Sequence, residues 1–162
     1  KAAAKLGLSI TTGGRAANFT TPEFAQILEA TADVPVVIEH LGSTDNPNDD
    51  PIEDSVFQQI FSLAKYPNAY IKVHGLGEFL KRSTFPSVPF PFDRPIRPML
   101  EMAYQAFGPQ RMMWGSDYPL VNQREGYRRA LQLTMDEFKS KSDEDRAWIF
   151  GKTAMKVFPI KS

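Results

Sequence analysis

Both histidines of the sequence and one aspartate occupy positions where a parallel sheet would expose reactive side chains. Each lies one or two residues after a short apolar segment: His40 after residues 34–38, His74 after residues 68–73, and Asp117 after residues 111–115. A neutral imidazole and a carboxylate can both bind a metal ion, and either can exchange a proton with water. The combination therefore suits metal ligation, or a metal-bound water activated by a general base.

Each of these residues also has an ordinary structural explanation. A histidine at a strand end can hydrogen-bond a neighbouring backbone carbonyl, which applies to His40 and to His74. Asp117 can cap a helix or form a turn before Pro119. The residue types alone leave both interpretations open.

The elements that must position these residues alternate along the chain. Strands are expected at residues 6–10, 34–38, 68–73 and 111–115, and helices after Thr21-Pro22, after Asp50-Pro51, after Asp93-Arg94-Pro95, and around residues 127–138 and 142–157. Alternation of strand and helix predicts an α/β domain over residues 1–162, with parallel strands joined by right-handed crossovers. Its ligand site should lie at the carboxyl ends of the strands. A small doubly wound sheet and half of an eight-stranded barrel would both show this order.

The composition excludes several classes of function. Nineteen basic and nineteen acidic residues balance, so the chain has no positive field that would favour nucleic acid or membrane surfaces as partners. The absence of cysteine excludes disulfides and zinc-thiolate sites and favours a cytoplasmic setting. No apolar stretch is long enough to span a bilayer. Because the sequence begins at Lys1, we expect a fragment or a processed product.

Four segments of the sequence resemble the amidohydrolase-related TIM-barrel hydrolases, a family with lactonase-like and decarboxylase-like branches. They are PVVIEHLG at residues 35–42, NAYIKVHG at 68–75, GPQRMMWGSDYP at 108–119 and IFGKTAMKVF at 149–158. They look like the sixth, seventh and eighth strands and the terminal helix of that family, and residues 6–10 look like the fifth strand. The resemblance implies the second half of a TIM (β/α)8 barrel, strands 5 to 8, with an extra helix at the carboxyl end.

The same resemblance implies roles for individual residues. Asp117 matches the aspartate after the last strand, which binds the metal or takes the proton from the attacking water. His40 matches the histidine after the sixth strand, which contacts the substrate or polarises the reacting group. Lys72 and His74 fall in a strand that often faces the substrate. The implied cofactor is a divalent metal ion, with zinc the expected one.

Two departures from the family pattern predict that the chain is incomplete. Thr11-Thr12 stands where some branches place a histidine, and the paired H-x-H ligands of the first strand are missing. The enzyme is then longer than this chain, the metal is dispensable, or the site has been lost. A half barrel also leaves open strand edges, so it needs either the missing amino-terminal half or a second copy as a partner.

A segment rich in phenylalanine and proline, residues 79–92, is a candidate lid over the site. Its Lys81 and Arg82 could pair with a substrate carboxylate; a hydrophobic plug is the alternative interpretation. The predicted function is hydrolysis of a lactone, ester or amide bond in a small carboxylated molecule. The alternatives are a non-oxidative decarboxylase of the same fold and a non-catalytic half-barrel module.

Overall fold

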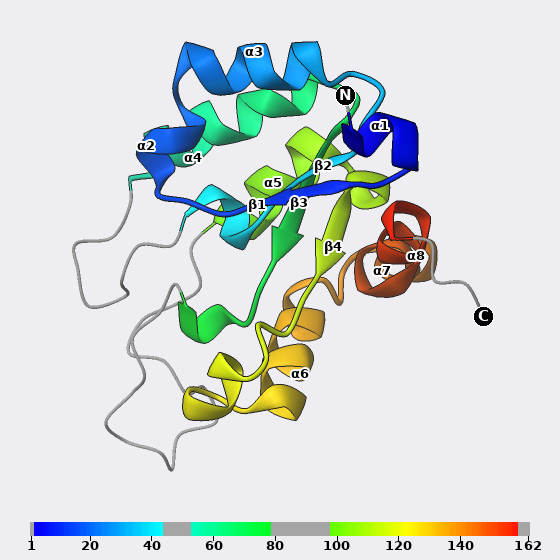
Figure 1. Cartoon of the computed structure of the whole chain (residues 1–162). Helices are drawn as coiled ribbons and strands as arrows, with labels where there is room; N and C mark the ends of the chain where they lie inside the picture. The colour runs from blue at the N-terminus through cyan, green and yellow to red at the C-terminus, as the bar shows by residue number, and fades with distance from the viewer. Residues whose placement is uncertain (1, 44–52, 79–97, 159–162) are drawn as a thin grey trace.

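Four parallel strands form the centre of the structure (Figure 1). The computed structural model describes residues 2–43, 53–78 and 98–158. The strands are β1 (Ile10–Thr12), β2 (Val36–Ile38), β3 (Ala69–Val73) and β4 (Met112–Trp114). They lie side by side in the order of the sequence, and each pairs in parallel with the next. A doubly wound sheet reverses its strand order, so this order confirms the predicted α/β half barrel.

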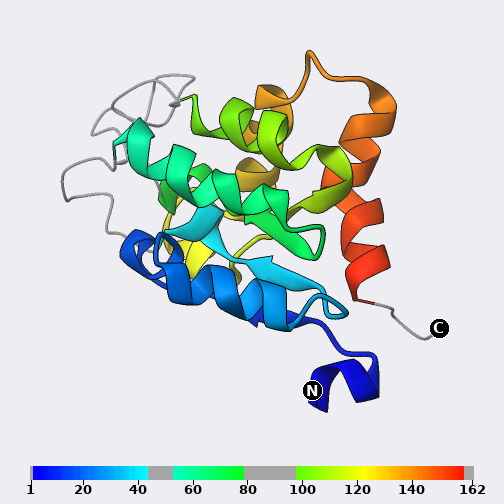
Figure 2. The same cartoon turned by 90° about the horizontal axis from the view of Figure 1, so that it is seen from above.

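The α-helices are α1 (Ala2–Leu6), α2 (Ala16–Phe19), α3 (Pro22–Ala30), α4 (Asp54–Phe61), α5 (Met99–Phe107), α6 (Tyr127–Glu137), α7 (Asp143–Ala147) and α8 (Thr153–Val157). Helices α2 to α5 pack on the outer face of the sheet, whereas the end of α8 contacts the inner face. Shorter turns are the 3-10 helices η1 (His40–Gly42), η2 (Ser62–Lys65), η3 (Leu76–Glu78), η4 (Pro109–Arg111) and η5 (Leu120–Gln123), and the π-helix η6 (Trp148–Lys152). Seen from above, α3, α4 and α5 follow one another across the outer face (Figure 2). Within the described ranges, no helix has the length and apolar character that crossing a membrane requires.

The main hydrophobic core lies between the sheet and these helices. In α4, Phe57, Ile60 and Phe61 have the i, i+3, i+4 spacing that places residues on one helix face, and all three are buried. They share one buried cluster with Ile38 of β2 and Ile71 of β3. Burying a side chain of this size stabilises the fold by about 1.5–3 kcal/mol, so this cluster fixes the strands that carry the site.

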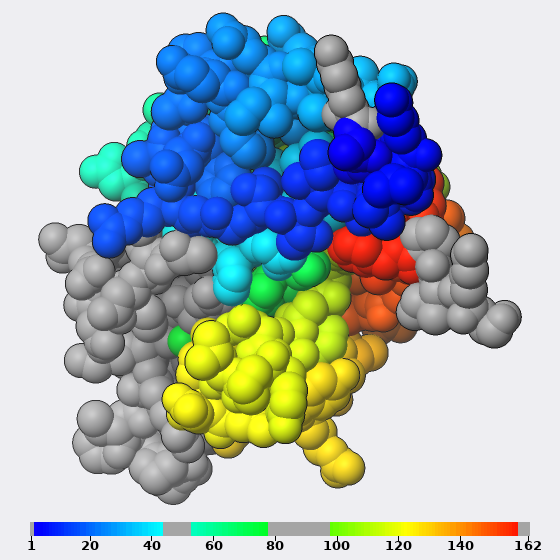
Figure 3. Space-filling view, in the orientation of Figure 1, coloured from blue at the N-terminus to red at the C-terminus, as the bar shows by residue number. Residues whose placement is uncertain are grey.

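The inner face of the sheet changes character along the strands. Val37, Tyr70 and Met113 form an apolar cluster with the end of α8. Because side chains alternate between the two faces of a strand, the next inward-facing residues toward the carboxyl ends are Glu39 and Lys72. In the space-filling view, the cyan and green ends of β2 and β3 reach the surface between the blue first strand and the yellow segment near residue 120 (Figure 3). The inner face is therefore apolar at one end and charged at the end where the site is expected.

The first strand lies at Ile10–Thr12, so the prediction of a strand at residues 6–10 is wrong in its position. Residues 2–6 form α1 because alanine is a strong helix former, and Gly7, with a φ of 62°, ends the helix. Leu6 and Leu8 are 70% and 54% exposed, so they are not part of a buried strand. Extended pairing starts only at Ile10, and the two threonines lie within β1 rather than after it.

The predicted start of α3 is confirmed. The Thr21 side chain accepts a hydrogen bond from the backbone N–H of Phe24, and Pro22 occupies the first helical position. Leu28 is fully buried in the core. The neighbouring Ile27 is 51% exposed.

Other predictions fall outside the described residues. They are the helix starts at Asp50-Pro51 and at Asp93-Arg94-Pro95, and the segment 79–92 with Lys81 and Arg82. The helices that follow the two expected starts are present, as α4 and α5.

Candidate active site

The carboxyl ends of β2, β3 and β4 bring His40, His74 and Asp117 together. His74 lies in the middle of the group. Its ring stacks on the ring of His40, with centroids 3.8 Å apart and 28° between the planes. Its Nδ1 lies 4.0 Å from Oδ1 of Asp117. The structure thus joins the three residues that the sequence placed at separate strand ends.

The backbone has an uncommon conformation at two of these residues. His40, Leu41 and Asp117 have φ values of 55°, 53° and 54° and are the non-glycine residues with positive φ in the described part of the chain. This left-handed region costs a non-glycine residue on the order of 1–3 kcal/mol, and such strain is concentrated at functional sites. Two of these three strained positions are therefore the residues expected to be catalytic.

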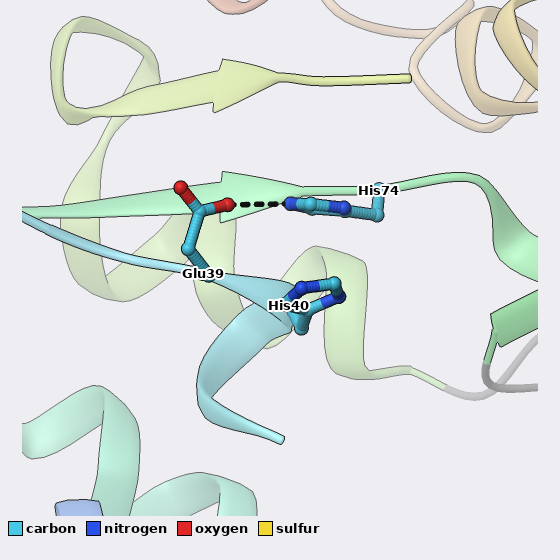
Figure 4. A group of neighbouring side chains, drawn as sticks. All are labelled: Glu39, His40 and His74. Carbon is cyan, nitrogen blue, oxygen red and sulfur yellow. Dashed lines mark hydrogen bonds and ion pairs between the residues drawn. The ribbon is translucent and has the colours of Figure 1, made fainter. Parts of the chain in front are cut away.

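Glu39 connects the inner face of β2 to β3. One carboxylate oxygen accepts a hydrogen bond from Nζ of Lys72 at 2.5 Å, and the other lies 2.7 Å from Nε2 of His74 (Figure 4). All three side chains are largely buried, with exposed fractions of 12% for Glu39, 19% for Lys72 and 6% for His74. Glu39 is therefore the shared acceptor for both neighbours.

The electrostatics of this group favour the carboxylate form of Glu39. Burial raises the pKa of Glu39, but hydrogen bonds from His74 and Lys72 and the charge of Lys72 lower it more. The pKa of the carboxyl consequently lies below its ordinary value. An ionised carboxylate can only accept hydrogen bonds, so Nε2 of His74 carries the hydrogen and donates it to Glu39 in this contact.

Asp117 is held from its other side by the turn that follows β4. Nη2 of Arg124 donates a hydrogen bond to Oδ2 of Asp117 at 3.1 Å, and Nε of Arg124 lies 3.8 Å from Glu125. The side chain of Glu125 is only 2% exposed and accepts a hydrogen bond from the backbone N–H of Gly77. These contacts tie the loop after β4 to the loop after β3, so the position of Asp117 depends on both.

Lys72 reaches Glu39 through space that Gly115 leaves open. A Cβ at Gly115 would lie 2.8 Å from Cδ of Lys72, closer than real carbon atoms approach. The ammonium lies 5.7 Å from the centre of the Phe158 ring, near enough for a cation–π contact. Contacts with Gly115 along the stem, and with Glu39 and Phe158 at the ammonium, therefore fix the position of the lysine side chain.

The predicted substrate-binding residues have different positions in the structure. Lys72 contacts Glu39, and His74 lies between Glu39 and Asp117, so both belong to the same group as the expected catalytic residues. Arg82 lies outside the described residues.

The described residues contain one group of three potential metal ligands, and Asp117 is not a member of it. In this group, a ligand atom from each of Glu39, His40 and His74 lies within 4.8 Å of the others. A carboxylate with two imidazoles is a suitable donor set for zinc. However, Lys72 and His74 occupy both Glu39 oxygens, and the two rings are nearly parallel. Imidazole lone pairs lie in the ring plane, so stacked rings do not direct them to one point, and the side chains as arranged do not fit a metal ion.

Sequence reasoning gave no role to Glu39 or to Arg124. Glu39 is two residues after the inward-facing Val37, so strand alternation places it on the inner face. That signal identifies a partner only when β3 is known to be the neighbouring strand. Arg124 lies in a turn without a periodic pattern, and no signal in the sequence pointed to it.

Comparison with known proteins identifies similar chains. A family model described as Amidohydrolase matches residues 1–160. No curated protein matches the chain. Among solved structures, an amidohydrolase from Burkholderia multivorans with bound zinc has 20% sequence identity and a TM-score of 0.77, with 98% of this chain and 55% of that chain covered.

Two further solved structures resemble the chain. Amidohydrolase 2 from Bifidobacterium longum subsp. infantis has 25% identity and a TM-score of 0.69, covering 99% of this chain and 53% of that one. A proposed 2-pyrone-4,6-dicarboxylic acid hydrolase from Pseudomonas putida has 19% identity and a TM-score of 0.67, covering 96% and 53%. The chain therefore spans about half the length of these solved relatives.

Proposed function

Because this chain belongs to the amidohydrolase family, we propose that its strand ends form part of a hydrolase active site. Asp117 takes the proton from the attacking water, and His40 stabilises or protonates the oxyanion that forms. One observation carries this proposal: both residues reach the same edge of the sheet, on either side of His74, and both have a left-handed backbone.

The surroundings of Asp117 support its role as a base. A general base must be ionised and fixed within reach of the water. Nη2 of Arg124 lies 3.1 Å from Oδ2 of Asp117 and fixes that oxygen with a charged hydrogen bond. The other oxygen faces His74 and remains the candidate to accept the proton of water.

The proposed substrate is a lactone, ester or amide of a small carboxylated molecule. A 2-pyrone is a cyclic ester, so the proposed pyrone-dicarboxylate hydrolase among the similar structures would act on a carboxylated lactone. Residues Lys81 and Arg82 of this chain could supply the positive charge that binds such a carboxylate.

Residues outside this chain are expected to complete the site. Four strands make half of an eight-stranded barrel, and the solved relatives are about twice as long as this chain. We propose that the other strands come from a missing amino-terminal half or from a second copy. A divalent ion, with zinc the expected one, would then be bound by Asp117 together with ligands from that other half.

The test is a substrate screen with the complete protein. Carboxylated lactones, esters and amides are incubated with the protein, and proton release is followed with a pH indicator while the products are identified by mass spectrometry. The proposal predicts ring opening or bond cleavage with incorporation of one oxygen from labelled water. Release of carbon dioxide without that incorporation would contradict hydrolysis and support a decarboxylase.

A further inference from the structure

We infer that Lys72 is the resident counterion of Glu39 and that it closes the group formed by Glu39, His40 and His74 to divalent cations. The inference concerns a binding property of this chain and does not depend on the proposed hydrolase activity. It starts from a disagreement in the site: the donor set suits zinc, but the side chains are not arranged to bind it.

The first argument is occupancy. Nζ of Lys72 lies 2.5 Å from Oε1 of Glu39, which is the distance of a short charged hydrogen bond. A metal ion ligated by this carboxylate would need the same lone pairs. The ammonium and a metal ion therefore compete for Glu39, and only one of them can be bound at a time.

The second argument is electrostatic. An ammonium that remains within a few ångströms repels a divalent ion, and this repulsion is strong because both Lys72 and Glu39 are largely buried. Lys72 also has little freedom to move away. Its stem lies against Gly115, and its ammonium lies near the ring of Phe158. The cost of displacing it adds to the cost of binding the ion.

The third argument concerns the imidazoles. His74 hydrogen-bonds the other oxygen of Glu39 and stacks on His40. With Lys72 in place, Glu39 is already neutralised and holds His74 in this orientation. Without the ammonium, one oxygen of Glu39 becomes accessible, and a modest rotation of the rings would direct their nitrogens toward a common ion.

The test measures binding of Zn²⁺ alone to the whole chain by isothermal titration calorimetry. Lys72→Met removes the charge but keeps an unbranched side chain in the space beside Gly115. The double variant Lys72→Met with Glu39→Gln removes the proposed ligand as well. Lys152→Met is the matched control, because Lys152 pairs with Glu144 at 2.8 Å on the exposed helical surface. Circular dichroism verifies that each variant is folded, and Lys72→Gln replaces Lys72→Met if the latter does not fold.

Loss of a unit positive charge this close to the ligands should tighten zinc binding at least about tenfold in Lys72→Met. The gain should disappear in the double variant, and Lys152→Met should bind as the wild type does. Equal zinc affinity in the wild type and Lys72→Met, or no binding by either, would overturn the inference. A gain that persists without Glu39 would also overturn it, since the ion would then bind elsewhere.

Discussion

The carboxylate of Glu39 lies 2.7 Å from Nε2 of His74, and this contact joins the end of β2 to the end of β3. The other ring nitrogen of His74 faces Asp117 at the end of β4. His74 is thus held between two carboxylates that come from different strands. His74 therefore connects the three strand ends through a hydrogen bond to Glu39 and a longer electrostatic contact with Asp117, and a change at Glu39 should reach Asp117 through His74.

Replacing Glu39 with glutamine should destabilise the fold. The change leaves Lys72 with a partly buried charge and a weaker acceptor, which costs about 1–3 kcal/mol of unfolding free energy. Urea denaturation of the two proteins measures this difference. Glu144→Gln is the control, because it changes a carboxylate that contacts a lysine at 2.8 Å on the exposed surface. Equal losses of unfolding free energy in the two variants would contradict a stabilising role for the partly buried Glu39 carboxylate.

Gly115→Ala should act through Lys72. A Cβ at residue 115 collides with the lysine stem, so the variant should lose about 1–3 kcal/mol of stability. In a double-mutant cycle, Lys72→Ala should remove most of that loss because it removes the colliding atoms. If Gly115→Ala is equally destabilising in both backgrounds, the collision with Lys72 is not its cause.

Arg124→Met should lower the turnover number more than it changes KM. The substitution removes the hydrogen bond that fixes Asp117, so the proton acceptor is less well placed in the transition state. Arg128→Met, at the exposed start of α6, serves as the control. Steady-state kinetics of the two variants should separate them, and an unchanged turnover number in Arg124→Met would argue against a positioning role.

A pH-dependent effect on stability is expected at Glu137, near the end of α6. Burial raises the pKa of Glu137, and the neighbouring Asp136 raises it further, whereas Lys139 lowers it in part. The charged form is therefore less favourable in the folded state than in the unfolded chain. The free energy of unfolding is therefore higher while Glu137 is protonated, and it falls as the pH rises from the ordinary value of 4.5 through the raised pKa.

Glu137→Gln should remove that loss. Above the window the variant should be more stable than the wild type by roughly 0.3 kcal/mol, a value reduced for solvent screening, and below it the two should agree. Glu101→Gln should have the opposite sign, because hydrogen bonds from Lys141 and Gln105 lower the pKa of Glu101. Denaturation at about pH 3.5 and about pH 7 measures both differences. Destabilisation by Glu137→Gln at neutral pH would contradict the assignment.

The sequence predicted the fold wherever local chemistry and tertiary packing agree. The β-branched run in residues 34–38 and the Thr21 cap before α3 both have the expected structure. Residues 6–10 do not, because an apolar run of that length is compatible with either a strand or exposed residues after a helix. Only pairing with β2 decides where β1 begins, and pairing is not encoded in a local pattern.

The site was predictable in part for the same reason. His40, His74 and Asp117 follow apolar segments, and the rule for parallel strands is enough to place them at one edge. The contacts of Glu39 depend on the register of β2 against β3, in which Ile38 lies opposite Ile71. That register is a tertiary property, so the sequence identified the residues at the strand ends but not the network that connects them.

The most direct test compares initial rates of lactone hydrolysis by the complete protein and its Asp117→Asn variant. The account predicts a loss of at least about 100-fold in turnover with an unchanged melting temperature, since the amide keeps the size of the side chain but cannot accept the proton. Asp136→Asn, on the exposed side of α6, should retain wild-type activity. Turnover by Asp117→Asn comparable to the wild type would contradict the proposed role of Asp117.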